Sequence, residues 1–165
     1  MILSKQEILN KIRKKEVLIK PFNKNNIGPA SIDLTLNNKF RIFKNKNIDL
    51  KKDTYKNITT LIEKDKILLE PGQLILGITK EKIKLPENIF GILQGRSRYA
   101  RLGLAIHITA AFVQPGINNK QILEIKNVSN NKIILYSGMR ICQLALLEVK
   151  GNAKYSGLFK KQDNL

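Results

Sequence analysis

The chain has 165 residues, of which 42% are apolar, and it carries a formal net charge of +17. This length allows one domain with a substantial core and is too short for two domains of ordinary size, so we expect a single domain over residues 1–165. No apolar run approaches the roughly 18 residues of a membrane span, and the start MILSKQEILN becomes polar too early for a signal peptide. We therefore expect a cytoplasmic protein with no membrane partner.

The positive charge comes mainly from lysines that are distributed along the whole chain. Lysine provides most of the 30 basic side chains, and in stretches such as NKFRIFKNKNIDLKKD it alternates with asparagine and isoleucine. No ladder of aromatic residues accompanies these lysines, although proteins that bind single-stranded nucleic acids stack bases on such residues. We therefore expect no nucleic-acid partner, while phosphate-bearing small molecules stay open as ligands.

The first predicted element is a short N-terminal helix. Ser4 and Glu7 form a capping box, and Ile8, Leu9 and Ile12 then lie on one face. From SIDLTL onward the apolar period changes to two, which predicts strands. The predicted strands are residues 31–36, 66–70, 73–79, 88–93, 104–109, 121–126, 132–136 and 140–149. Many short strands divided by Pro-Gly and Ser-Gly turns predict a mainly β fold: a sandwich, a barrel or a jelly roll.

Two segments differ from this pattern. Residues 45–65 form a lysine-rich insertion that we expect to be exposed. The tail over residues 151–165 contains little apolar material, so we expect its order to depend on a bound ligand. The single cysteine, Cys142, cannot form an internal disulfide, and its apolar neighbours in RICQLALLEV predict a place in the core.

An arginine cluster follows the predicted strand NIFGIL. Arg96, Arg98 and Arg101 fall within six residues, in a chain with only three other arginines. The planar guanidinium suits bidentate binding of phosphate or carboxylate. The segment SRYARLG predicts one helical turn that starts at Ser97 and is closed by Gly103. Its N–H groups, with Arg96 and Arg98, would make an anion cradle, and the alternative is a solvated basic turn.

A second candidate is Glu124, which lies among apolar neighbours in QILEIK. Glutamate is rarely buried without a partner. By strand alternation it shares a face with Ile122 and Lys126, so an ion pair with Lys126 or simple exposure would account for it. The functional interpretation is a carboxylate in a partly apolar site that takes up and returns protons near neutral pH.

The residue inventory argues against several classes of site. His107 is the only histidine and Cys142 the only cysteine, so the ligands of a catalytic zinc site are missing. Neither a P-loop nor a dinucleotide-binding glycine motif is present. A triad of Ser97, His107 and Asp33 can be drawn, but no spacing supports it, and we expect a packed or hydrogen-bonded structural histidine.

Three motifs in order resemble the dCTP deaminases of the dUTPase superfamily. GRSRYARLGLAIHITAAFVQPG followed by ILEI is similar to the family signature GRSSLARLG…HVTA…IDPG…LE. The start of the chain is similar to the family's N-terminus, and AKYSG resembles its C-terminal segment. The resemblance covers most of the chain and is weakest over residues 45–65. It implies one dCTP deaminase-like domain with a jelly-roll-like distorted β-barrel, and a homotrimer with active sites at subunit interfaces.

The resemblance also assigns roles to residues. It implies zinc-independent hydrolysis of dCTP to dUTP and ammonia, with Glu124 as general base, Arg101 orienting it and Ser97 positioning the water or the amine. Mg²⁺ would be bound through the substrate triphosphate, and the tail over residues 151–165 would close over the nucleotide. By motif position Arg96, Ala110, Lys154 and Tyr155 match substrate-binding residues of the family, and we add Arg98 and Gln114 as candidate substrate-binding residues at positions where the chain departs from it.

Gln114 departs from the family pattern. The family has Asp in IDPG where this chain has VQPG, and that Asp resembles the residue with which dUTPases activate water against the α-phosphate. An amide cannot act as a general base, so Gln114 counts against hydrolysis of dUTP, although it could hydrogen-bond the deoxyribose. Arg98 replaces a common serine and Leu158 a common phosphate-contacting glutamine, and both changes bear on nucleotide binding.

Three functional hypotheses follow. The first is a dCTP deaminase that releases dUTP, with dTTP as a candidate regulator. The alternative is a dUTP diphosphatase, or a bifunctional enzyme that forms dUMP and pyrophosphate; GMRICQL resembles a dUTPase motif and supports it, whereas Gln114 opposes it. The third is a non-catalytic protein that binds nucleotides or nucleic acid on an enzyme scaffold, which the presence of Ser97, Arg101 and Glu124 disfavours.

Overall fold

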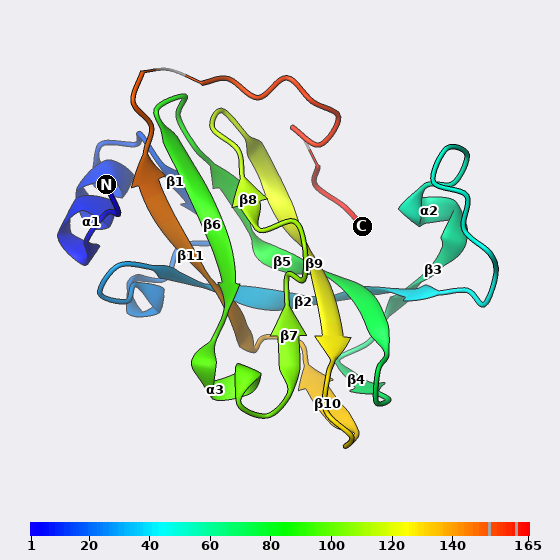
Figure 1. Cartoon of the computed structure of the whole chain (residues 1–165). Coiled ribbons are helices and arrows are strands. Elements are labelled where there is room, and N and C mark those ends of the chain that lie inside the picture. The colour runs from blue at the N-terminus through cyan, green and yellow to red at the C-terminus, as the bar shows by residue number, and fades with distance from the viewer. Residues whose placement is uncertain (152, 161) are drawn as a thin grey trace.

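The computed structural model describes residues 1–151, 153–160 and 162–165 (Figure 1). Its main feature is a nine-stranded sheet with the order β7-β9-β5-β2-β11-β6-β8, in which β1 also pairs with β5 and β3 with β2. β4 and β10 form a separate two-stranded sheet. The two ends of the large sheet, β7 and β8, are consecutive in the chain, so residues 107–111 connect them directly. The sheet therefore curls into an incomplete barrel (Figure 1).

The strands are β1 (Leu18–Lys20), β2 (Ile32–Phe43), β3 (Thr59–Glu63), β4 (Lys66–Leu69), β5 (Leu74–Lys84), β6 (Ile89–Gly95), β7 (Leu104–Ile106), β8 (Phe112–Val113), β9 (Asn118–Asn127), β10 (Ile133–Tyr136) and β11 (Arg140–Glu148). The helices are α1 (Lys5–Arg13), the 3-10 turn η1 (Lys24–Asn26), α2 (Tyr55–Ile58) and α3 (Ser97–Ala100). The mainly β prediction is confirmed.

The predicted N-terminal helix is confirmed as α1. The Ser4 hydroxyl accepts a hydrogen bond from the Glu7 N–H at 3.4 Å, and Ile8 is fully buried against the sheet. Each predicted strand also has a counterpart. Three strands were not predicted, namely β1, β3 and β8, because two or three residues carry no readable alternation and β3 lies in the lysine-rich insertion.

The expectation that residues 45–65 are exposed is confirmed for most of the segment and is wrong at Ile58 and Thr59, which are buried. β3 pairs with β2 from Lys39↔Glu63 to Phe43↔Thr59, and Thr59 is buried. The Thr59 hydroxyl accepts a 3.1 Å hydrogen bond from Nη1 of the buried Arg41. A buried guanidinium needs such acceptors, so this pair fixes the hairpin that projects at the right of Figure 1.

Cys142 lies in the core, as expected, with no exposed surface. Burial raises the pKa of its thiol well above the usual value, and the nearby Glu81 and Asp33 carboxylates add to the shift. The longest helix, α1, has nine residues, and within the described ranges we find no helix with the length and apolar character needed to cross a membrane.

The tail packs along the first half of β9. The N–H groups of Asn118 and Lys120 donate to the carbonyls of Lys160 and Gln162 at 3.2 and 2.8 Å. Leu165 is buried against Leu76 and Ile78. The tail, whose order we expect to depend on a bound ligand, thus has an apolar contact at its end, and residues 152 and 161 lie outside its described part.

Candidate functional site

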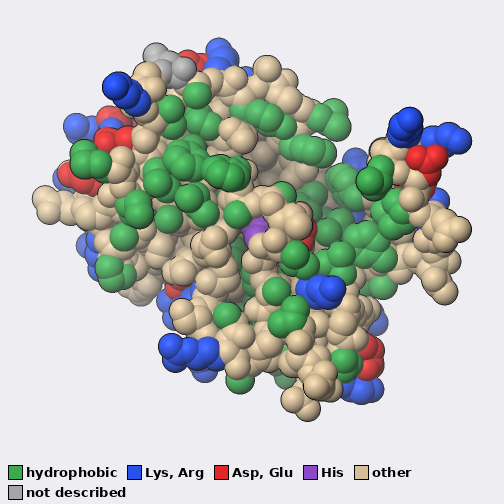
Figure 2. Space-filling view, in the orientation of Figure 1, with side chains coloured by type: hydrophobic (Ala, Val, Ile, Leu, Met, Phe, Trp, Pro, Cys, Tyr) green, Lys and Arg blue, Asp and Glu red, His purple; other side chains and the backbone are tan. Residues whose placement is uncertain are grey.

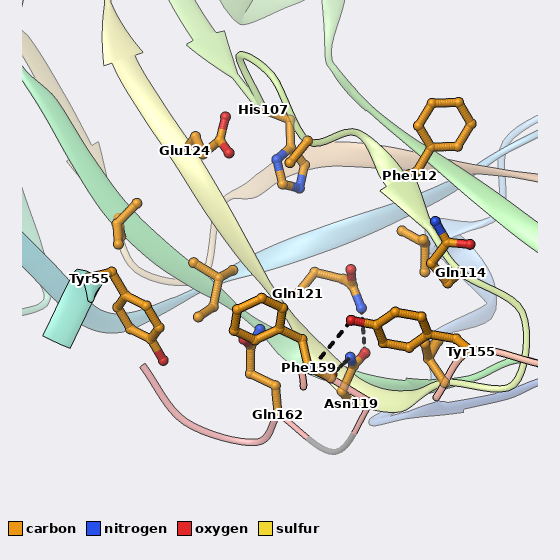
Figure 3. Close-up of a pocket in the computed structure, with 15 residues that line it drawn as sticks. Tyr55, His107, Phe112, Gln114, Asn119, Gln121, Glu124, Tyr155, Phe159 and Gln162 are labelled. Carbon is orange, nitrogen blue, oxygen red and sulfur yellow. Dashed lines mark hydrogen bonds between the residues drawn. The ribbon is translucent and has the colours of Figure 1, made fainter. Parts of the chain in front are cut away.

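A cavity of about 330 Å³ lies between the β7–β8 connection, β9 and the tail (Figure 3). Figure 2 shows the single histidine at the centre of this face, with hydrophobic side chains on both sides of it. The lining residues are Tyr55, Leu76, His107, Ala110, Phe112, Val113, Gln114, Ile117, Asn119, Gln121, Ile122, Glu124, Tyr155, Phe159 and Gln162. Glu124 is the one acidic side chain among these lining residues.

Glu124 is held in this cavity by Thr109. The Thr109 N–H and the Thr109 hydroxyl both donate to Oε2 of Glu124, at 2.8 and 2.9 Å. Both bonds converge on one oxygen, so within the described residues Oε1 has no hydrogen bond and stays available for a ligand. The ion pair with Lys126 that sequence alternation allowed is not formed. A carboxylate with one oxygen fixed and the other directed to a cavity is arranged to accept a proton from a bound water.

His107 lies beside Glu124 (Figure 3) and ends strand β7. Its φ of 59° is left-handed, so the strand predicted over residues 104–109 stops at Ile106. The His107 N–H donates to the Glu124 carbonyl at 3.0 Å, whereas both ring nitrogens are buried without a partner among the described residues. Burial lowers the pKa of His107 below its usual value, and the Glu124 carboxylate opposes that shift. Of the two expectations, the packed histidine is confirmed and the hydrogen-bonded one is not, and the lowered pKa favours the neutral ring.

No catalytic triad forms. Oδ2 of Asp33 accepts ion pairs from Arg96 Nη2 at 3.2 Å and from Arg140 Nη1 at 3.5 Å. The Asp33 carboxylate is therefore occupied by two guanidinium groups and does not orient His107.

Three more predicted binding residues line the same cavity as Glu124: Ala110, Gln114 and Tyr155. Gln114 is exposed and directly follows β8. The Tyr155 hydroxyl accepts the Phe159 N–H at 3.4 Å, which keeps both tail rings at the cavity wall. The tail thus contributes apolar surface to the cavity.

The arginine cluster lies outside this cavity. The predicted turn forms as α3, which begins at Ser97 and is followed by Gly103 with a φ of 84°. Ser97, Arg98 and Arg101 are exposed, and Arg96 is bonded to Asp33 and to the Arg140 carbonyl. Arg101 makes no ion pair with any residue in the described ranges. The three predicted catalytic residues therefore do not meet within one chain.

Lys154 also lies outside the cavity, and its ammonium pairs with Glu87 at 3.1 Å.

Sequence analysis missed Thr109, the donor that holds Glu124, although it stands in the HITA motif. It also missed the amide pair of Gln121 and Asn119, in which Nε2 donates to Oδ1 at 2.6 Å. Polar residues in strand alternation look solvent-facing, so only the curl of the sheet shows that they line a cavity.

Among the residues that the structure describes, no group of three His, Cys, Asp or Glu side chains could hold a metal ion.

Comparison with known proteins places these residues in context. A family profile described as "dCTP deaminase-like" matches residues 2–149. The "dCTP deaminase, dUMP-forming" of Corynebacterium kroppenstedtii is 39% identical over 160 residues, covering 93% of this chain and 85% of that protein. The protein of the same name from Nanoarchaeum equitans is 39% identical over 168 residues, covering 90% and 85%.

Solved structures show the same fold. The 2'-deoxycytidine 5'-triphosphate deaminase of Agrobacterium tumefaciens aligns with a TM-score of 0.73 at 17% identity, over 90% of this chain and 48% of that longer chain. The dUTPase from phage phi11 of S. aureus aligns with a TM-score of 0.51 at 14% identity, over 86% of this chain and 95% of that one. The expected barrel fold is confirmed.

Replacing Thr109 with valine should lower turnover by roughly 10- to 100-fold, because a hydrogen bond to a charged group contributes about 1.5–3 kcal/mol. Valine keeps the branched shape and the N–H donor and removes only the hydroxyl. We expect the loss in kcat with little change in KM, measured by steady-state kinetics. Thr109→Ser restores the hydroxyl and should recover most of the rate; a serine variant as slow as the valine variant would contradict this role.

Stability should depend on the titration of His107. Because its pKa is lowered in the folded state, the unfolded chain binds the proton more tightly, and the free energy of unfolding rises with pH. The contribution is complete above the unfolded pKa of about 6.5 and is lost as the pH falls toward the folded pKa. His107→Asn tolerates positive φ and cannot titrate. Urea unfolding at about pH 5 and about pH 8 should show a smaller difference for the variant than for the parent chain.

Proposed function

The chain belongs to the dCTP deaminase-like family, and we propose that it deaminates dCTP hydrolytically and converts the nucleotide on to dUMP. The observation that carries the deamination is the Glu124 carboxylate, fixed at Oε2 by Thr109 in a cavity with Ala110 and Gln114. The second step rests on the relatives, whose names describe dUMP formation. This product differs from the dUTP of our first hypothesis and agrees with its alternative.

In the proposed deamination, Glu124 removes a proton from water as the water oxygen attacks C4 of the cytosine ring. The carboxylic acid gives this proton to N3, and the Glu124 carboxylate then takes the proton of the new C4 hydroxyl and passes it to the amino group. C4=O forms as the C4–N bond breaks, and ammonia leaves. Thr109 holds Oε2 throughout, so the same oxygen, Oε1, faces the water and the ring. Neutral His107 adds no charge beside Glu124, which leaves the carboxylate unpaired and able to act as a base.

We place Ser97 and Arg101 in the same reaction through a neighbouring copy of the chain. Both are exposed, and Arg101 has no ion pair within the described residues. Large apolar side chains near the two halves of the site are also exposed, at 67% for Leu102, 45% for Ile108 and 68% for Phe112. A homotrimer would cover such a surface and bring α3 of one copy to the cavity of the next.

The substrate would bind as its Mg²⁺ complex, with the metal carried by the triphosphate. Arg96 and Arg98 supply guanidinium groups for its phosphates, and Lys154 and Tyr155 approach from the tail. The Lys154–Glu87 pair is exposed, so exchanging Glu87 for a phosphate costs little. The tail then closes over the nucleotide. We assign this chemistry to the cytoplasm.

A second candidate function is deamination that stops at dUTP, and Gln114 favours it. Formation of dUMP needs a water activated against the α-phosphate, with pyrophosphate as the leaving group. Gln114 cannot remove a proton, and Glu124 is the one acid that lines the cavity among the residues that the structure describes. Hydrolysis in this chain therefore has to use Glu124 or a carboxylate of a neighbouring copy.

The product distribution decides between these candidates. Purified protein incubated with dCTP and Mg²⁺ should yield dUMP and pyrophosphate, separated by ion-exchange chromatography, with added dUTP as a parallel substrate. Accumulated dUTP that stays intact would establish the second candidate, and Gln114→Asp should then create dUMP formation. No product from either nucleotide would overturn the proposed function.

Glu124→Gln tests the base directly. The amide keeps the shape and the hydrogen-bond acceptor for Thr109 but cannot take a proton, so turnover of dCTP should fall by roughly 10²–10⁴-fold. Binding of dCTP, measured by equilibrium dialysis, should change little. A variant with unchanged turnover would contradict the assignment of Glu124.

A further inference from the structure

A second cavity, of about 320 Å³, lies on the outer face of β1, β5 and β9. Its lining residues are Leu18, Lys20, Lys82, Lys84 and Asn118, and it shares none of them with the cavity around Glu124. The proposed reaction uses none of these side chains. The concentration of lysine in so small a cavity therefore needs its own explanation.

The strand register places these lysines in a line. Lys20 lies opposite Lys82 in the β1–β5 pair, and Lys82 lies opposite Lys120 in the β5–β9 pair. Opposite residues share a face, so three ammonium-bearing side chains stand side by side over two strand spacings, about 10 Å. Lys84 is two residues from Lys82 and points to the same side, since Ile83 between them is buried. We call Lys20, Lys82, Lys84 and Lys120 the lysine row.

The charge of the lysine row is largely uncompensated. Like charges directly opposite each other on neighbouring strands destabilise a sheet. Only Lys82 has a partner, Oδ2 of Asp163, at 2.7 Å. The other three ammonium groups make no ion pair with a residue in the described ranges. Four positive charges thus share one carboxylate.

Asp163 shows that the row already binds an anionic group. It belongs to the tail, and its neighbour Gln162 is bonded to β9 in both directions: the Lys120 N–H donates to the Gln162 carbonyl at 2.8 Å, and Gln162 Nε2 donates to the Lys120 carbonyl at 3.3 Å. Gln162 also lines the first cavity. The contact of Asp163 with the row is therefore connected to the wall of the candidate active site.

We propose that the lysine row binds a small phosphoanion with several phosphoryl groups in sequence, from a free polyphosphate or a nucleotide. Such a chain can contact three ammonium groups on adjacent strands at once, which a single carboxylate cannot. Lysine is a compact point charge rather than a planar fork, so the row recognises charge and not a base. The anion replaces Asp163 on Lys82, and the tail segment at Gln162 loosens.

The extent of acetylation at each lysine, measured by mass spectrometry, tests this site residue by residue. Because the lysine row does not line the first cavity, triphosphate bound in that cavity does not affect the measurement. Inorganic tripolyphosphate should protect Lys20, Lys84 and Lys120 and leave the exposed Lys51 and Lys64 reactive. In the double variant Lys20→Gln/Lys84→Gln, the tripolyphosphate concentration that half-protects Lys120 should rise by at least about tenfold, because two charge-assisted hydrogen bonds are lost. The matched double variant Lys51→Gln/Lys64→Gln removes the same charge and should shift it by less than about twofold.

Asp163 provides the second test. Asp163→Asn should lower the midpoint for tripolyphosphate by about two- to fivefold, because an exposed ion pair contributes up to about 1 kcal/mol. In a Lys82→Gln background the same substitution should have no effect, because the pair is already absent. An equal effect in both backgrounds would contradict competition between the anion and Asp163.

The source of the phosphate is distinguished by further probes. A purine nucleoside triphosphate should protect the row with a midpoint similar to that of tripolyphosphate. Much tighter binding of the nucleotide would overturn recognition by charge alone. Protection by a single-stranded DNA oligonucleotide without protection by either small anion would overturn the proposal in favour of a nucleic-acid surface. Equal protection of Lys51 and Lys64 would contradict a specific site, because it would show that the anion binds the positively charged chain without selecting the lysine row.

Discussion

The pair of hydrogen bonds from Thr109 to Glu124 holds the β7–β8 connection against strand β9 of the curled sheet. Thr109 stands in the connection from β7 to β8, and Glu124 stands on β9, next to β7. The bonds therefore fix the connection against the sheet that it leaves, and they orient the one acidic group of the cavity at the same time. The left-handed backbone at His107 belongs to this arrangement, because it turns the chain out of β7 just before Thr109. The loop path and the position of the base thus meet at one contact.

Sequence reasoning reached the strands and the candidate base but not the shape of the site. Alternation in SIDLTL and the capping box at Ser4 are local signals, and local signals predicted β2 and α1. The role of Thr109 depends on the curl of the sheet, which brings residues 107–111 over β9, and no local pattern encodes it. The same limit explains Arg41 and Thr59: a buried guanidinium inside a lysine-rich stretch looks exposed until its hydroxyl partner is placed beside it.

The basic residues divide into three kinds by their environment. Arg96 and Arg140 share Asp33, so their guanidinium groups are fixed by a carboxylate before any ligand arrives. Arg101 is exposed and has no such partner in the described part of the chain. Lys20, Lys82 and Lys120 oppose one another across three strands, which is a costly arrangement without a counter-anion. The formal charge of +17 is thus the sum over basic and acidic residues in different environments, and it does not describe the chemistry of any one site.

The burial of Cys142 gives the native chain a practical property. Its thiol has no exposed surface, and burial raises its pKa, so a maleimide or iodoacetamide reagent meets no reactive thiolate in the folded protein. A cysteine introduced at Leu158, which is 90% exposed on the tail, would therefore be the sole site of labelling. A fluorophore or spin label there would report the tail's position without any background from the core, and the native cysteine need not be removed.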